Sequence, residues 1–231
     1  MGERFDGLGK GLVAFLRDLE KNNKREWFQK NKERYQECVQ EPMLAFIRAL
    51  APKLERFAPH IVASDSKTGG SLMRIHRDVR FSKDKRPYNT HVSAQFRHER
   101  GKNVHAPGFY VRIDPKEVWL GTGIWQPDTP AVTKIRKRIA AKPAEWKKAR
   151  DGKTFKTAFG ELGGESLKRP PRGFDPEHAY VEDLKRKDFV AFRKLKPAQA
   201  AGPGFLDEAV KAYKASGPFM EFLCEALRLR Y

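Results

Sequence analysis

Residues 74–88 carry most of the side chains in this chain that have the types and spacing to do chemistry. The stretch surrounds two carboxylates with six basic residues: Asp78 and Asp84 with Arg74, Arg77, Arg80, Lys83, Lys85 and Arg86. Guanidinium groups bind phosphate or carboxylate through paired hydrogen bonds. A divalent metal needs negatively charged ligands, so the excess of cations favours an anion over a metal ion.

Three interpretations of this stretch are compatible with the sequence. In the first, it binds a small phosphate- or carboxylate-bearing ligand, with these ligand-binding residues: Arg74, Arg77, Arg80, Lys85, Tyr88 and His91. In the second, Asp78 and Asp84 hold the arginines in a purely structural salt-bridge network. In the third, His76 or Asp78 is a catalytic acid or base. Charge alone does not separate binding from catalysis.

Other chemical signatures are weak. Gly152-Lys153-Thr154 resembles the end of a phosphate-binding loop, but position 147, where that loop needs its first glycine, is Lys147. Of the six histidines, His76 and His91 are expected on adjacent strands near Asp78, but Arg74 and Arg80 flank that position and would repel a metal ion. The pattern of a dinucleotide-binding loop is absent. The sequence therefore predicts neither a metal nor a cofactor.

A second basic region, residues 134–156, offers an alternative function. The whole chain has 47 Lys and Arg against 29 Asp and Glu, a net charge of +18, and such a field attracts polyanions. Lysines on a helix would bind phosphates without reading sequence, and Trp119, Trp125 and Trp146 would stack on bases if they are exposed. This predicts a non-specific nucleic-acid-binding protein, unless the segment is an ordinary amphipathic helix with a solvated face.

The elements that must position these residues follow from hydrophobic periodicity. Apolar residues at helical spacing predict three helices within residues 1–57, with Asn23 capping the second and Pro42 opening the third. From Leu72 to Phe81 the period is two, which predicts a strand with Arg74, His76, Asp78 and Arg80 on one face. Arg77 falls on the apolar face and needs a partner in or beside the core.

Further strands follow at residues 90–98, 108–113 and 118–125, the last two joined by a turn at Asp114-Pro115. Short connections without helices between strands predict an antiparallel sheet. We expect one α+β domain over residues 1–231, with an antiparallel β-sheet of about four to six strands from residues 71–126. Three N-terminal helices pack on it, and residues 129–231 add a mainly helical C-terminal part.

The chain has features of a cytoplasmic protein. Cys38 and Cys224 form no closely spaced pair, and residues 1–12 lack the apolar core of a signal peptide. No segment approaches the length of apolar sequence that spans a membrane. We expect reduced cysteines and no membrane partner.

The charged stretch also carries a family resemblance. The pattern Arg74-x-x-Arg77-Asp78-x-Arg80-Phe81-x-x-Asp84-Lys85-x-x-Tyr88 resembles the signature of a bacterial family catalogued as domain of unknown function 2461. Similar segments extend over nearly the whole chain: Phe15-Leu16 to Asn22-Asn23, Trp27-Phe28, Asn31, Pro107 to Tyr110, Gly121-x-Gly123-x-Trp125 and Pro171 to Phe174. The resemblance implies a stand-alone protein of about this length and no particular activity. It marks the charged motif as the region in which to look for function.

Overall fold

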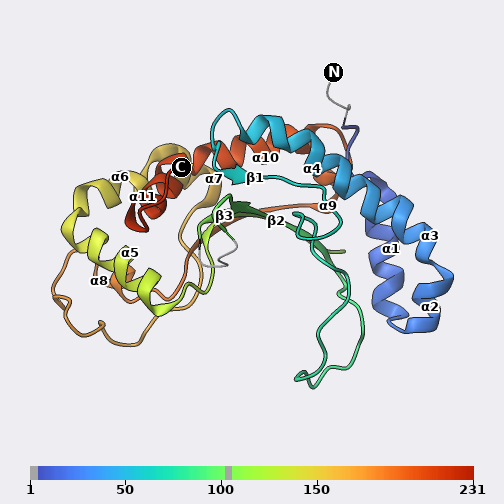
Figure 1. Ribbon diagram of the computed structural model, residues 1–231, viewed down its shortest axis with the longest axis horizontal. Coiled ribbons are helices and arrows are strands. Elements are labelled where there is room, and N and C mark those ends of the chain that lie inside the picture. The colour runs from blue at the N-terminus through green and yellow to red at the C-terminus, as the bar shows by residue number, and fades with distance from the viewer. Residues whose placement is uncertain (1–4, 102–105) are drawn as a thin grey trace.

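The computed structural model describes residues 5–101 and 106–231 and confirms an α+β fold with a five-stranded antiparallel sheet (Figure 1). The strands lie in the order in which they occur along the chain: β1 (Ile61–Val62), β2 (Val92–His98), β3 (Gly108–Ile113), β4 (Val118–Ile124) and β5 (Phe189–Leu195). The predicted hairpin is present, since Ile113 pairs with Val118 across a turn closed by Asp114 and Glu117.

Helices before the sheet are those expected, with one subdivision. They are α1 (Gly9–Lys21), α2 (Arg25–Lys30), α3 (Lys32–Tyr35), the π-helical turn η1 (Gln36–Gln40) and α4 (Glu41–Leu54). The predicted second helix is therefore two short α-helices and a π-helical turn that continues directly into α4. The predicted cap is wrong, because Lys24 rather than Asn23 is the N-cap of α2, and its ammonium has no acceptor with which to cap the helix. The Asn23 side-chain amide bonds instead to a distant segment, at Tyr88.

The C-terminal part of the chain holds the helices after β4: α5 (Thr129–Ala141), α6 (Pro143–Asp151), α7 (Lys153–Phe159), α8 (Val181–Leu184), α9 (Pro197–Ala200), α10 (Gly204–Ala215) and α11 (Gly217–Ala226). Helices α5, α6, α8 and α11 lie at the other end of the molecule, whereas α10 packs on α4 and α9 on α1 (Figure 1). Within this part, β5 was not predicted. Its sequence begins with three buried apolar residues and then becomes basic, so it lacks the alternation that identifies a half-exposed strand.

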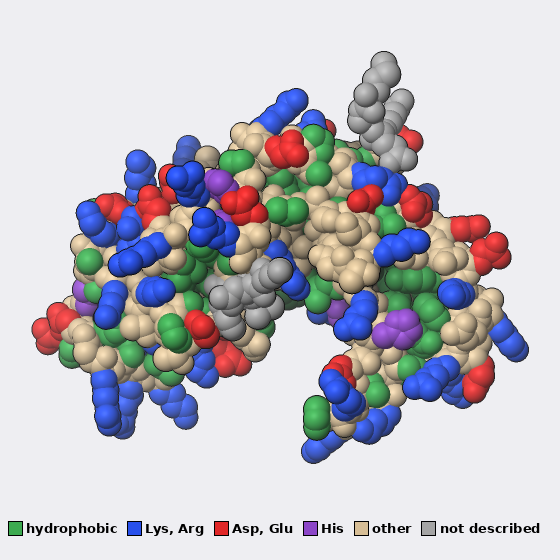
Figure 2. Space-filling model, in the orientation of Figure 1, with side chains coloured by type: hydrophobic (Ala, Val, Ile, Leu, Met, Phe, Trp, Pro, Cys, Tyr) green, Lys and Arg blue, Asp and Glu red, His purple; other side chains and the backbone are tan. Residues whose placement is uncertain are grey.

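Helices α4 and α10 cover one face of the sheet (Figure 1). Val92, Ala94 and Phe96 of β2 point into this layer and are buried. The Phe96 ring contacts Phe46 of α4 and Tyr213 of α10, with centroid distances of 6.4 and 6.3 Å. The opposite face looks into a hollow between the two ends of the molecule, which Figure 2 shows below its middle.

The predicted strand Leu72–Phe81 is wrong beyond its first residues. Residues 71–73 pair with β2, since Met73 N–H donates to the Ser93 carbonyl and Gln95 N–H to the Ser71 carbonyl. At Arg74 the chain leaves the sheet and projects into solvent, returning at Tyr88 (Figure 1). A strand this rich in charge on both sides gains more from hydration than from burial against a sheet.

In the described parts of the chain, no helix has both the length and the apolar character needed to cross a bilayer.

Candidate ligand-binding site

We call residues 74–88 the charged arm. Its two limbs pair at the base, where Arg77 N–H donates to the Pro87 carbonyl and Asn89 N–H to the Ile75 carbonyl. His76 and Tyr88 form the bridge between the limbs. The arm is therefore a short two-chain ribbon at its base that opens into a loop.

The base of the arm is held by the N-terminal helices. The buried Tyr88 ring stacks on Phe28 of α2, with centroids 4.1 Å apart. The Asn23 side chain donates to the Tyr88 carbonyl at 2.9 Å and accepts from the Tyr88 N–H at 3.0 Å. This pair of hydrogen bonds reproduces the way two peptide groups pair across a sheet. It anchors the returning limb to the α1–α2 connection.

Two copies of one local motif, Asp-x-Arg, order the loop of the arm. Asp78 accepts from the backbone N–H of Arg80 and from its guanidinium, with the shortest bond at 2.7 Å. Asp84 makes the same set of bonds to Arg86. In each copy the carboxylate closes a turn through a backbone N–H two residues on and binds a guanidinium in a fork. The arginine fork and backbone bond hold the pKa of both carboxyl groups below the usual range.

Arg77 finds its partner on the arm itself. Its guanidinium donates to Asp84 Oδ2 at 2.7 Å and to the Arg86 carbonyl at 3.3 Å. It does not enter the core, although its side chain is only 23% exposed. Asp84 thus binds two arginines, one from each limb, whereas Asp78 binds one.

The remaining cations of the arm face solvent. Lys85 donates from Nζ to the Val79 carbonyl, which fixes the turn at the tip. Arg74 and Lys83 are exposed and form no ion pair with a described residue. At the tip, Phe81 is 96% exposed, with the Arg80 guanidinium 5.8 Å from its ring centre. Figure 2 shows the basic side chains gathered on this projection.

The two histidines predicted near the charged stretch occupy different places. His76 is exposed at the base of the arm, with its ring 5.1 Å from that of Tyr88. His91 is half-buried just before β2, where burial lowers its pKa to about 4 and the positive charge of Arg112 adds to the effect. His91 is therefore neutral at physiological pH and suited to hydrogen bonding rather than to charge pairing with a phosphate.

The predicted ligand-binding residues are accordingly not gathered around one enclosed pocket. Arg77 and Arg80 are engaged by carboxylates, and Tyr88 is buried against α2. Of the catalytic candidates, Asp78 is a weak base, because Arg80 stabilises its ionised form. In the described ranges, no three His, Cys, Asp or Glu side chains gather as a metal site would require.

The basic region 134–156 is divided among α5, α6 and α7, and part of its charge is used internally. Arg136 is buried and donates to the Arg186 carbonyl, while Arg150 bonds to the buried Asp183. Trp146 is fully buried and donates to the same carboxylate, so it is unable to stack on a ligand. The cations left on the surface include Lys134 and Lys137, both exposed.

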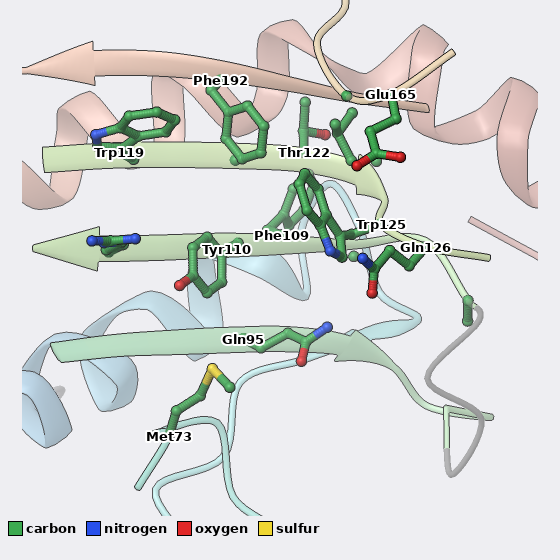
Figure 3. Close-up of a pocket in the computed structure, with 17 residues that line it drawn as sticks. Met73, Gln95, Phe109, Tyr110, Trp119, Thr122, Trp125, Gln126, Glu165 and Phe192 are labelled. Atoms are coloured by element: carbon green, nitrogen blue, oxygen red, sulfur yellow. The ribbon is translucent and has the colours of Figure 1, made fainter. Parts of the chain in front are cut away.

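A cavity of about 870 Å³ lies on the open face of the sheet, and we call it the sheet cavity (Figure 3). Strand pairing sets Gln95, Tyr110, Gly121 and Phe192 side by side across β2 to β5, so their side chains share this face. The next row, towards the β3–β4 turn, is Ser93, Arg112, Trp119 and Lys194. The cavity therefore has an aromatic floor with cations at one end.

Glycine lets an aromatic ring lie close to the sheet. Gly121 lies between Tyr110 and Phe192, and a Cβ atom there would meet the Phe192 ring at 3.0 Å. The absence of a side chain therefore allows the Phe192 ring to occupy the space over Gly121. Trp125 stands at the rim, 53% exposed, with its ring 6.3 Å from Phe192.

One buried carboxylate holds the rim. Asp188, at the start of β5, accepts from the Gln126 N–H at 2.7 Å and from the Glu165 N–H at 2.9 Å. Gln126 has φ of 45°, a left-handed conformation that is unfavourable for a residue with a side chain. The bond to Asp188 stabilises that conformation and so positions the adjacent Trp125.

The arm and the sheet cavity adjoin. Met73, the last residue before the arm, lines the cavity and accepts a hydrogen bond from Ser93. The sequence-based prediction identified the arm but missed Tyr110 and Phe192. One sequence feature could have predicted them: an aromatic residue at a strand position that faces away from the core and opposite a glycine on the neighbouring strand. Tyr110, which pairs with Gly121, is such a residue.

Together these features define an α+β protein that carries helices on one face of an antiparallel sheet and, on the other, a cavity beside a charged arm. A family model described as "Conserved hypothetical protein (DUF2461)" matches residues 11–222, and the chain belongs to this family. Neither the curated proteins nor the solved structures contain a match to the chain.

Proposed function

We propose that the charged arm binds the phosphate groups of a polyanion that lies along its exposed surface. The observation that carries this proposal is the internal use of both carboxylates. Asp78 and Asp84 are paired in forks with Arg80 and Arg86, so the negative charge of each is compensated by a guanidinium. Six cations against two carboxylates leave the arm strongly positive.

The openness of the arm favours an extended ligand over a small one. None of its residues lines the sheet cavity, and the arginine forks are turned onto the carboxylates of the arm. A single small anion would therefore meet few cations at once. A polymer with regularly spaced phosphates meets several and gains from the release of its counterions.

The experiment is a salt titration with inorganic polyphosphate, a polyanion that has no rings. Arg74→Ala with Lys83→Ala removes two exposed charges of the arm that make no ion pair with described residues. The matched control, Lys134→Ala with Lys137→Ala, removes two exposed charges of α5. Affinity is measured by fluorescence anisotropy from about 50 to about 200 mM salt.

We expect the arm variant to bind more weakly and to lose about two units of the salt slope, about one per phosphate contact. The α5 variant should keep the wild-type slope. Loss of binding in the α5 variant alone would move the site to region 134–156. Equal binding by all three proteins would leave the arm with a structural role only.

A further inference from the structure

We infer that the sheet cavity stacks the bases of single-stranded nucleic acid whose phosphates lie on the charged arm. The inference rests on the proposed function of the arm and names the class of polyanion. It is carried by the cavity itself: an open sheet face, lined by aromatic rings, that adjoins the charged arm at Met73.

The rings are arranged as a stacking platform. Tyr110 and Phe192 stand in the same row of the open face, on either side of Gly121, with the Phe192 ring close over the glycine (Figure 3). Trp125 extends the platform at one rim. Every base has a π-face, so stacking on such rings binds single strands without selecting sequence.

Trp119 has a different part in the cavity. The ammonium of Lys194 lies 4.5 Å from the centre of its ring, and its Nε1–H donates to Glu117 at 2.8 Å. One face of this indole is therefore already occupied by a cation. Lys194 and Arg112 are its neighbours in the same row, each 3.5 Å from a carboxylate oxygen, of Glu117 and Asp114 respectively. A phosphate of the backbone would compete with these exposed ion pairs where it leaves the platform.

The distribution of exposed hydrophobic side chains supports the same ligand. Of the four large hydrophobic side chains that the structure describes as exposed, Met73 and Trp125 line the cavity and Phe81 forms the tip of the arm; the fourth is Val62. Apolar side chains exposed together beside a basic surface are typical of sites that bind ring-containing anions.

The shape of the site favours a single strand. In a duplex the faces of the bases are covered by their neighbours, and only an unpaired base can lie flat on Tyr110 or Phe192. An anionic bilayer would reach the projecting Phe81 but not the floor of a concave cavity. Exposed rings at the arm tip therefore suit a bilayer, whereas rings on the cavity floor suit single strands.

The test compares ligands of matched charge: oligothymidylate, oligouridylate, a DNA duplex, inorganic polyphosphate and anionic phospholipid vesicles. We expect both single strands to bind more tightly than polyphosphate and to quench tryptophan fluorescence. Trp125→Ala and Tyr110→Leu should each weaken single-strand binding by about tenfold, within the range for one base–ring stack. Both should leave polyphosphate binding unchanged, and Trp125→Phe, which keeps a ring, should retain most of the affinity.

Phe81→Ala is the control for position, because Phe81 is an exposed ring outside the cavity. If Phe81→Ala weakens single-strand binding and Trp125→Ala does not, the stacking site is the arm tip and the inference is wrong. It is equally wrong if duplex or vesicles bind most tightly. Equal affinity for single strands and polyphosphate would show that no base stacks in the sheet cavity, and the inference would be wrong while the proposed function of the arm remained intact. If neither is bound, both proposals fail.

Discussion

At the residue scale, the charged arm owes its order to one motif used twice. Asp78 and Asp84 each bind the backbone and the guanidinium of the arginine two residues later. Asp84 also receives Arg77 from the other limb, so it ties together two parts of the arm. The arm thereby keeps a defined shape without a hydrophobic core.

The two carboxylates should differ in importance. Asp84→Asn retains the shape of the side chain but removes the charge that binds Arg77 and Arg86. Global stability should change little, because the pairs are solvent-exposed. Amide hydrogen exchange within residues 74–88 should accelerate clearly. Asp78→Asn, which loses only Arg80, is the matched control; equal acceleration in both variants would contradict the cross-limb role of Asp84.

His91 predicts a pH dependence of stability. Its pKa in the folded protein is about 4, because burial and Arg112 disfavour the charged ring more than Asp114 favours it; Arg77 also disfavours the charge. The unfolded value is about 6.5, so between these values the unfolded state binds more protons. Stability should therefore fall as pH decreases from about 6.5 to about 4. Urea unfolding at several pH values should show a shallower decline for His91→Gln, and parallel declines would refute this origin.

At the element scale, sequence pattern predicted the elements whose apolar residues face the core. Val92, Ala94 and Phe96 alternate with polar residues, and β2 lies where they predict it. Leu72–Phe81 shows the same period but has no sheet partner beyond residue 73, and only Ile75 within the arm's first limb is buried. Periodicity detects an extended chain; it does not reveal whether a neighbour exists to pair with it.

The link between the arm and the helices also depends on a contact that sequence does not show. Asn23 bonds to Tyr88, which lies 65 residues away. Asn23→Ala should lower the free energy of unfolding by about 1–3 kcal/mol, since it removes two partly buried hydrogen bonds. Asn22→Ala is the control, because it removes one exposed local bond to the Asp18 carbonyl. Urea unfolding of both variants measures the difference, and equal stabilities would argue against the anchor.

The rim of the sheet cavity gives a second prediction at this scale. Asp188→Ala leaves the N–H groups of Gln126 and Glu165 without their acceptor. Stability should fall by about 1–3 kcal/mol, the cost of unsatisfied partly buried groups. Tryptophan emission should shift to longer wavelength as Trp125 loses its fixed position. Asp175→Ala, which removes one exposed bond to the Glu177 N–H, should change neither; a wild-type spectrum for Asp188→Ala would count against its positioning role.

At the scale of the whole molecule, α4 and α10 lie on one side of the sheet, and the arm and cavity lie on the other, in the hollow between the helices at the two ends (Figures 1 and 2). The net charge of +18 draws anions to the whole surface, but the hollow is where cations and exposed rings adjoin. The long-range attraction of anions by the net charge and their short-range contacts with cations and rings thus favour binding on the same side of the sheet, in the hollow.

The sheet order has a consequence for how the protein folds. Strands β2, β3 and β4 follow one another through short connections, so their pairing closes short loops, whereas β1 pairs with β2 across residues 63–91. Strand β5 joins only after residues 125–188 have been enclosed, which makes its pairing with β4 the slower, entropically costlier step. Phe192 and the Asp188 anchor both arrive with β5. The cavity is therefore expected to be completed late on the folding pathway, and a partly folded chain would display the basic arm before it possessed the aromatic platform.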